Sequence, residues 1–360
     1  MKIKGSQLFW ILATIYVVMA IGVVLTPTVT IVQQDAWISL LASGIAGVIL
    51  TFLLGRLALL HPDQSLFQVC QKLLGKWLGR IIVLPYFCSF IGITSVVFRA
   101  QVDFVQTILL NGTPTWAIMV ILFSVTFYLT YGGITNIGRF SEITGPILYF
   151  LILLSFILNW GNIRLERLLP VYVDHGGLAI FQGMLPFAPL LGGQAIILLV
   201  LSSFMTDPKQ VPSRSVAAAG IASFMIALSV MICIVVLGPE LTMKLNTPIF
   251  VMIRAIDIMD FIQNLDIIFL FIAIFGTVIM LSSFAFVASY EMSQWVNLKD
   301  WRRMVWFVVP TVTVISRILH GPTYMGVFLK IWSLFVVPIC VIIIPLLLWV
   351  TYLFKRTATG

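Results

Sequence analysis

Ten apolar runs, each long enough for a membrane-crossing helix, fill most of this chain. They cover residues 8–29, 36–59, 81–110, 115–135, 143–159, 178–204, 215–238, 267–290, 304–319 and 331–354. A hydrocarbon core about 30 Å thick needs about 20 apolar residues of helix per crossing. Transmembrane β-strands would instead show alternating apolar and polar residues in segments of about ten. The runs therefore predict an all-α integral membrane protein with ten transmembrane helices.

The rest of the composition excludes several classes of function. Only 9% of the 360 residues are charged, against about 25% in soluble domains, so a single membrane domain, 1–360, is expected. The net charge of +8 is spread without a dense Lys/Arg run, which argues against nucleic-acid binding. The three histidines are isolated from one another and from the four cysteines, so no metal site is expected. Because no phosphate-binding glycine loop and no G-x-S-x-G turn occurs, we expect neither an enzyme nor a cofactor.

The distribution of Lys and Arg predicts the orientation of the spans. If the N-terminus is inside, fourteen of the 21 basic residues fall in loops on that side, six fall outside and Arg99 lies within a span. Cytoplasmic loops carry the excess of Lys and Arg, so both termini are expected in the cytoplasm. The start of the chain also resembles a signal peptide, but the spans that follow favour an uncleaved first helix.

The ten spans divide into two sets of five, at about 8–159 and 178–354. Because five is odd, the second set would cross the membrane upside down relative to the first. Inverted repeats of this kind are a common plan of secondary transporters, and interrupted spans at corresponding positions indicate the binding site. The first and sixth spans are the corresponding pair.

Both of these spans contain helix breakers. The sixth carries PFAPLLGGQ, residues 186–194, and the first carries Gly22 and Pro27. Non-helical backbone survives in lipid only where it is buried in protein or lines a wet cavity, so the breaks predict a binding site. Free N–H groups at helix N-termini suit a carboxylate and free carbonyl groups suit an ammonium group, which favours an amino acid, although a sugar can use the same groups. The candidate ligand-binding residues at the breaks are Ala20, Gly22, Val23, Phe187, Pro189, Gly192 and Gly193.

Polar residues in the third and eighth spans add candidates. Arg99 and Asp103 are four apart, so they share one helix face within contact range. They are interpreted as a ligand-binding or gating pair, with a structural ion pair and an interfacial position as alternatives. In the eighth span Thr277, Ser282 and Ser283 can contact a ligand, although interhelical packing explains such residues equally well.

One loop between spans is long enough to carry structure of its own. The stretch NTPIFVMIRAIDIMDFIQN, residues 246–264, starts with a helix-start signal and spaces Arg254, Asp257 and Asp260 by three. It is expected to form an amphipathic helix, either packed over the outer mouth of the protein or lying at the membrane interface.

The chain resembles the B subunits of bacterial spore germinant receptors, the endospore germination permease family of the amino acid–polyamine–organocation transporter superfamily. The resemblance rests on the order of several stretches over nearly the full length: MKIKGSQLFW, MAIGVVLTP, LLHPDQSLFQVCQKLLGKWLGR, PFAPLLGGQ and SSFMTDPKQ. It implies a LeuT-like 5+5 inverted repeat with broken first and sixth helices.

The resemblance also implies a function. Such a protein would be a nutrient sensor in the inner spore membrane, working with an A-type membrane subunit and a C-type lipoprotein. Its ligand would lie between the first, third, sixth and eighth spans. Asp103 matches an acidic residue of the third span that belongs to the polar pathway in the family, whereas Arg99 is less typical.

The sequence therefore predicts the ligand-sensing subunit of a germinant receptor that binds a small nutrient, in the first instance an amino acid. An amino acid permease driven by an ion gradient is the alternative, and it differs only in whether the substrate crosses. A scaffold subunit with a vestigial pocket is a third interpretation.

Overall fold

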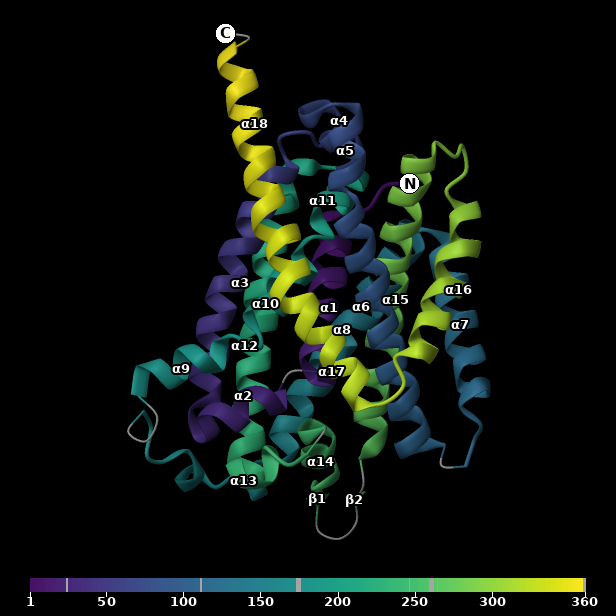
Figure 1. Ribbon diagram of the computed structural model, residues 1–360. Helices are drawn as coiled ribbons and strands as arrows, with labels where there is room; N and C mark the ends of the chain where they lie inside the picture. Colours follow the sequence, from purple (N-terminus) through teal and green to yellow (C-terminus); the bar gives the residue numbers. More distant parts are fainter. Residues whose placement is uncertain are drawn as a thin grey trace.

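The protein is a bundle of long helices that run along one common axis (Figure 1). The computed structural model describes residues 1–23, 25–110, 112–172, 176–245, 247–258, 262–263 and 265–358. Both chain ends lie toward the same end of the bundle, at the top of Figure 1. This arrangement agrees with two termini on one side of a membrane.

The first half of the chain forms the following elements: α1 (Gly5–Val23), α2 (Leu25–Val32), η1 (Gln33–Asp35), α3 (Ala36–Ala58), α4 (Leu66–Leu74), α5 (Lys76–Ile82), α6 (Leu84–Phe104), η2 (Val105–Leu109), α7 (Thr115–Gly132) and α8 (Ile134–Leu158). Short helices η3 (Trp160–Asn162) and η4 (Leu165–Leu168) follow in the connection to the second half.

The second half forms α9 (Gly176–Met184), α10 (Ala188–Ala195), α11 (Leu198–Leu201), η5 (Ser202–Phe204), η6 (Pro208–Gln210), α12 (Val211–Leu237), α13 (Pro239–Thr242), α14 (Pro248–Arg254), β1 (Asp257–Ile258), β2 (Ile262–Gln263), α15 (Asp266–Val296), α16 (Arg302–Ile318), α17 (Pro322–Ile331), η7 (Trp332–Val336), η8 (Ile339–Ile343) and α18 (Ile344–Ala358). The last four elements form one nearly continuous rod, drawn in yellow in Figure 1.

All ten predicted spans fall on helices. Within the described residues, seven helical stretches are long and apolar enough to cross a membrane, and shorter apolar helices cover Gly5–Ala20 and Leu191–Phe204. The count of ten crossings stays a prediction, because the first, sixth and ninth spans are short. The helix of the fifth span is longer than the predicted apolar run, since α8 already begins at Ile134. The amino-terminal part of α8 contains the charged residue Glu142. Its carboxylate is stabilised there because Ser6 and Gln7 both donate hydrogen bonds to it.

The sixth span is interrupted, as predicted, and the first changes direction. Helices α1 and α2 lie on either side of residue 24, which is outside the described residues, and α2 lies across the bundle axis beside α9 (Figure 1). The sixth is divided at a turn of residues 185–187, between α9 and α10, and α10 and α11 are separated again after Ala195. The break therefore falls at Pro186, and the Gly192–Gly193 pair lies inside α10 instead of at the opening that the sequence predicted.

Small residues allow the central helices to approach closely. A Cβ on Gly44 of α3 would lie 2.6 Å from Cβ of Ser223 in α12. A Cβ on Gly276 of α15 would overlap a methyl group of Val18 in α1. Such contacts are the usual basis of helix association in lipid, and here they hold α3 against α12 and α1 against α15.

The loop before α15 differs from the expected amphipathic helix. Its helix α14 ends at Arg254, and β1 and β2 then pair antiparallel with Asp257 opposite Gln263. Asp260 lies outside the described residues. The prediction of one continuous helix is wrong, because α14 is buried through most of its length and has no polar face to expose.

Candidate ligand-binding cavity

A cavity of about 90 Å³ lies between α1, α6 and α15, near the last residues described in α1. It is lined by Val18, Met19, Val97, Ala100, Gln101, Phe104, Thr247, Phe269, Ile272, Ala273 and Thr277. Pockets for drug-sized ligands measure about 300–1,000 Å³. The volume of this cavity therefore suits a small ligand, and its wall is mostly apolar with a few polar groups.

The polar end of the cavity is formed by Gln101 of α6 and Thr277 of α15. The hydroxyl of Thr277 donates a hydrogen bond of 2.9 Å to Oε1 of Gln101. Gln101 is only 7% exposed, and its Nε2 has no hydrogen-bond partner among the described residues. A buried amide without a partner costs about 1–3 kcal/mol, so this group is suited to bind a ligand that accepts a hydrogen bond.

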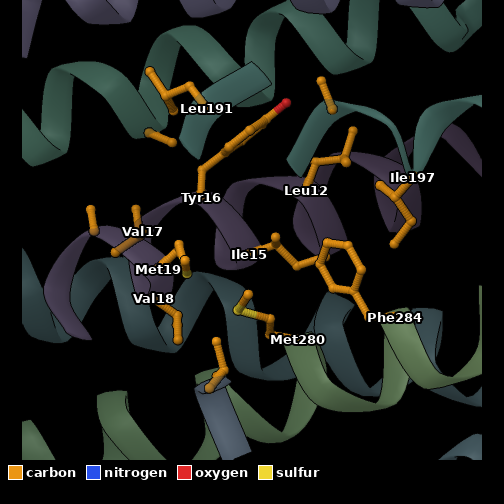
Figure 2. Packing of buried hydrophobic residues seen from close by; sticks show 14 of the residues in the cluster. Leu12, Ile15, Tyr16, Val17, Val18, Met19, Leu191, Ile197, Met280 and Phe284 are labelled. Atoms are coloured by element: carbon orange, nitrogen blue, oxygen red, sulfur yellow. The ribbon is translucent and has the colours of Figure 1, made fainter. Parts of the chain in front are cut away.

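The apolar wall comes largely from α6 and α15, and α1 adds Val18 and Met19. Figure 2 shows Tyr16 and Leu191 on one side of α1 and Val18 and Met280 on the other. The close contact between Gly276 and Val18 holds α1 against α15. The lining residue Met19 lies one turn before Val23, the last residue described in α1.

Of the twelve residues predicted from the sequence, the structure places Thr277 in the cavity wall. Ala20 is fully buried in α1 but does not line the cavity. The side chains of Val23 and Pro189, and the surroundings of Gly22, lie outside the described residues. Their role in ligand binding stays a prediction.

The described residues of PFAPLLGGQ do not line this cavity. A Cβ on Gly193 would lie 2.5 Å from the ring of Trp332, and one on Gly192 would lie 3.2 Å from Leu50. The two glycines therefore let α10 pack closely against the carboxyl-terminal rod and α3. Phe187 is 1% exposed and directly precedes α10.

The two serines of α15 lie deeper in the bundle. Ser283 donates a hydrogen bond of 2.7 Å to the carbonyl group of Ile279 in its own helix. The Ser282 hydroxyl is fully buried and has no partner among the described residues. Neither serine lines the cavity, and the packing interpretation describes Ser283 better.

Arg99 and Asp103 form the predicted pair, but they face away from the cavity. Nε of Arg99 donates to Oδ2 of Asp103 at 3.0 Å, and its Nη2 lies 2.8 Å from Nδ1 of His320, just beyond α16. A helix turns by about 100° per residue, so Gln101 points about 200° away from both. Sequence reasoning missed Gln101, although an amide inside an apolar span was a usable signal. Nutrient binding by the pair stays a prediction.

Comparison with known proteins identifies the family. The profile of a family described as spore germination protein matches residues 2–325. The chain belongs to this family. Spore germination protein YndE of Bacillus subtilis (strain 168) is 27% identical over 252 residues, which are 68% of this chain and 69% of that protein. Spore germination protein KB of the same organism is 25% identical over 245 residues, or 68% of this chain and 66% of that protein.

Solved structures identify the fold. MhsT in complex with L-phenylalanine is similar with a TM-score of 0.65 and 14% identity, over 98% of this chain and 99% of that chain. Mhp1, a nucleobase-cation-symport-1 family transporter with bromovinylhydantoin bound, gives a TM-score of 0.65 and 15% identity, over 91% and 75% of the two chains. At such identities the likeness concerns the fold alone. This family member therefore has the LeuT-type fold of a multi-pass membrane protein.

Proposed function

We propose that this protein is the ligand-sensing membrane subunit of a spore germinant receptor, and that it binds a small nutrient in the cavity between α1, α6 and α15. The family and the names of its relatives support a role in germination. The proposal assigns binding to the protein, with no enzymatic step and no cofactor.

The observation that carries the proposal is the buried amide of Gln101. Its oxygen is fixed by Thr277 and its Nε2 lacks a partner within the described part of the chain, inside a cavity of about 90 Å³. A ligand with an acceptor oxygen would restore the missing hydrogen bond. Because that bond forms only when ligand is present, it provides binding energy of about 1–3 kcal/mol.

An amino acid is the ligand class that this chemistry favours. Nε2 of Gln101 is a donor that suits a carboxylate. The carboxyl-terminal end of α1 carries partial negative charge, which suits an ammonium group. A donor and a partly negative helix end together match a zwitterion, and MhsT, which shares the fold, was solved in complex with L-phenylalanine. A sugar hydroxyl would use the amide but not the helix end.

An ion-gradient-driven amino acid permease is the second candidate, and the transporter fold favours it. The two functions differ in a deletion experiment. If the protein is a sensor, spores without the gene fail to germinate with one nutrient, while growing cells take up that nutrient at the normal rate. Reduced uptake by growing cells would overturn the sensor in favour of the permease.

The proposed receptor includes two partners, an A-type membrane subunit and a C-type lipoprotein, in the inner spore membrane. Relatives named as spore germination proteins support this assignment. A tagged copy of this protein, purified from spore membranes, is expected to retain both partners in constant ratio. Recovery of the tagged protein alone from gently solubilised membranes would contradict the proposed assembly.

A further inference from the structure

A second recess lies between α6, α7 and α16, and it shares no lining residue with the central cavity. Its volume is about 520 Å³. It is lined by Arg99, Thr115, Trp116, Met119, Arg317 and His320. None of these residues takes part in the proposed nutrient site, so the recess needs its own explanation.

The recess carries an excess of positive charge. Arg99 is 4% exposed and is paired with Asp103, and it also contacts His320. Arg317 is exposed, and it forms no ion pair with any described residue. The recess and its surroundings thus contain two guanidinium groups and one carboxylate, which leaves an excess of positive charge. The free guanidinium of Arg317 can bind an anion through two parallel hydrogen bonds, a geometry that fits carboxylate and phosphate groups.

The recess also faces the lipid. Its neighbouring helix faces carry exposed apolar side chains: Val120 at 54% and Ile121 at 63% on α7, and Val314 at 60% and Ile318 at 70% on α16. Trp116, which is 64% exposed, lies in the first turn of α7. Tryptophan at a helix end is typical of the membrane–water interface.

The position of the recess along the bundle agrees with that interface. Helix α7 begins at Thr115 and α16 ends at Ile318, both toward the end of the bundle opposite the two chain termini (Figure 1). A helix end and an exposed tryptophan are the features expected at the depth of lipid headgroups. Basic pockets between transmembrane helices on the cytoplasmic side bind such headgroups, and this recess offers the same chemistry at the opposite end of the bundle.

We propose that this recess binds the phosphate group of an anionic membrane lipid. Arg317 holds the phosphate, buried Arg99 adds positive charge from below, and the ring of Trp116 lies against the lipid. Arg99 then belongs to the wall of a lipid site instead of the nutrient cavity, and Asp103 is its ion-pair partner.

Thermal unfolding of the purified full chain in detergent tests the proposal. Short-chain phosphatidylglycerol is expected to raise the unfolding midpoint, whereas phosphatidylcholine of the same chain length leaves it unchanged. In the Arg317→Gln variant the half-saturating concentration of phosphatidylglycerol should rise at least tenfold, because a hydrogen bond to a charged group contributes about 1.5–3 kcal/mol. Arg317 is exposed, so this variant is expected to fold.

The matched control is Arg254→Gln, which removes another exposed arginine, at the end of α14 and outside the recess. This control should keep the response of the unmodified protein. An equal loss in both variants would show a diffuse charge effect and overturn the site. If glycerol phosphate also raises the unfolding midpoint, and this rise depends on Arg317, the recess binds a soluble anion and the proposal of a lipid ligand is wrong.

Discussion

At the scale of single residues, the contact between Thr277 and Gln101 determines which hydrogen-bonding atom is available to a ligand. The hydroxyl of Thr277 holds the amide oxygen, and Nε2 has no hydrogen-bond partner among the described residues. Without this hydrogen bond the amide is free to rotate, and its donor is no longer directed at the ligand. The threonine therefore acts as a positioning residue for the glutamine.

We predict that Thr277→Val raises the nutrient concentration for half-maximal germination by about tenfold, since one lost hydrogen bond of about 1.4 kcal/mol corresponds to that factor. Dose–response curves of spores carrying the variant measure it. The matched control is Thr126→Val, because Thr126 is equally buried but does not line the cavity. If both variants shift the curve equally, or neither does, the cavity assignment fails and the scaffold interpretation gains support.

Arg99 and Gln101 lie on opposite faces of the same helix, and this explains which site residue could be predicted from the sequence. Charge drew attention to Arg99 and Asp103, and their spacing correctly predicted that they pair. Spacing does not say which face of the third span turns toward the centre of the bundle. That choice depends on contacts with α15 and α16, which are distant in sequence, so the amide of Gln101 could not be selected over the ion pair.

At the scale of elements, the close approach of α1 and α15 positions the cavity. Gly276 lies one residue before Thr277 and directly against Val18. An added methyl group there must push α1 away from α15 or distort Val18. Overpacking of this kind costs about 1–3 kcal/mol.

We predict that Gly276→Ala lowers the unfolding midpoint of the purified protein and weakens nutrient binding as well. A matched variant is Gly220→Ala in α12, where an added Cβ meets no atom within 4 Å. That variant should keep the midpoint or raise it slightly, because alanine favours the helix. The same midpoint for both variants would contradict the close packing of α1 on α15.

A second link between elements joins α15 to α4, the short helix that follows α3. Oε2 of Glu291 accepts a hydrogen bond of 2.9 Å from the backbone N–H of Phe67, in the first turn of α4. Glu291 is fully buried. A carboxylate at a helix N-terminus stabilises the free N–H groups there, so this residue fastens α4 to the bundle.

We predict that Glu291→Ala increases hydrogen exchange at the amides of α4 several-fold. Hydrogen–deuterium exchange read by mass spectrometry would measure this change over Leu66–Leu74. Glu240→Ala, at an exposed position in α13, serves as the control and should leave the exchange of α4 unchanged. Unchanged protection in the Glu291 variant would show that α4 is held by its other contacts.

The positions of helices were predictable from hydropathy, but the places where they break were less so. Prolines and glycines correctly indicated an interrupted sixth span. The turn follows Met184, whereas Gly192 and Gly193 continue the helix. Glycine is needed at these two positions because Trp332 and Leu50 occupy the space that a side chain would fill. These partners come from elsewhere in the chain, so local propensity alone could not separate a break from a packing contact.

The whole molecule combines a transporter-like fold with a family of spore germination proteins. Both chain ends lie at the same end of the bundle. We predict that both termini are cytoplasmic, because the basic residues are concentrated on that side. Reporter fusions at each end, active only in the cytoplasm, should both be active in growing cells; an inactive fusion at either end would contradict this topology.

The most direct test of the nutrient site is equilibrium binding to the purified protein. Radiolabelled amino acids are screened first, and the strongest binder is then measured on Gln101→Leu and on the control Gln106→Leu, which changes a glutamine of η2 outside the cavity. We expect the dissociation constant to rise at least tenfold for the first variant and to remain unchanged for the second. Undiminished affinity in Gln101→Leu would contradict the account that the cavity between α1, α6 and α15 binds the nutrient.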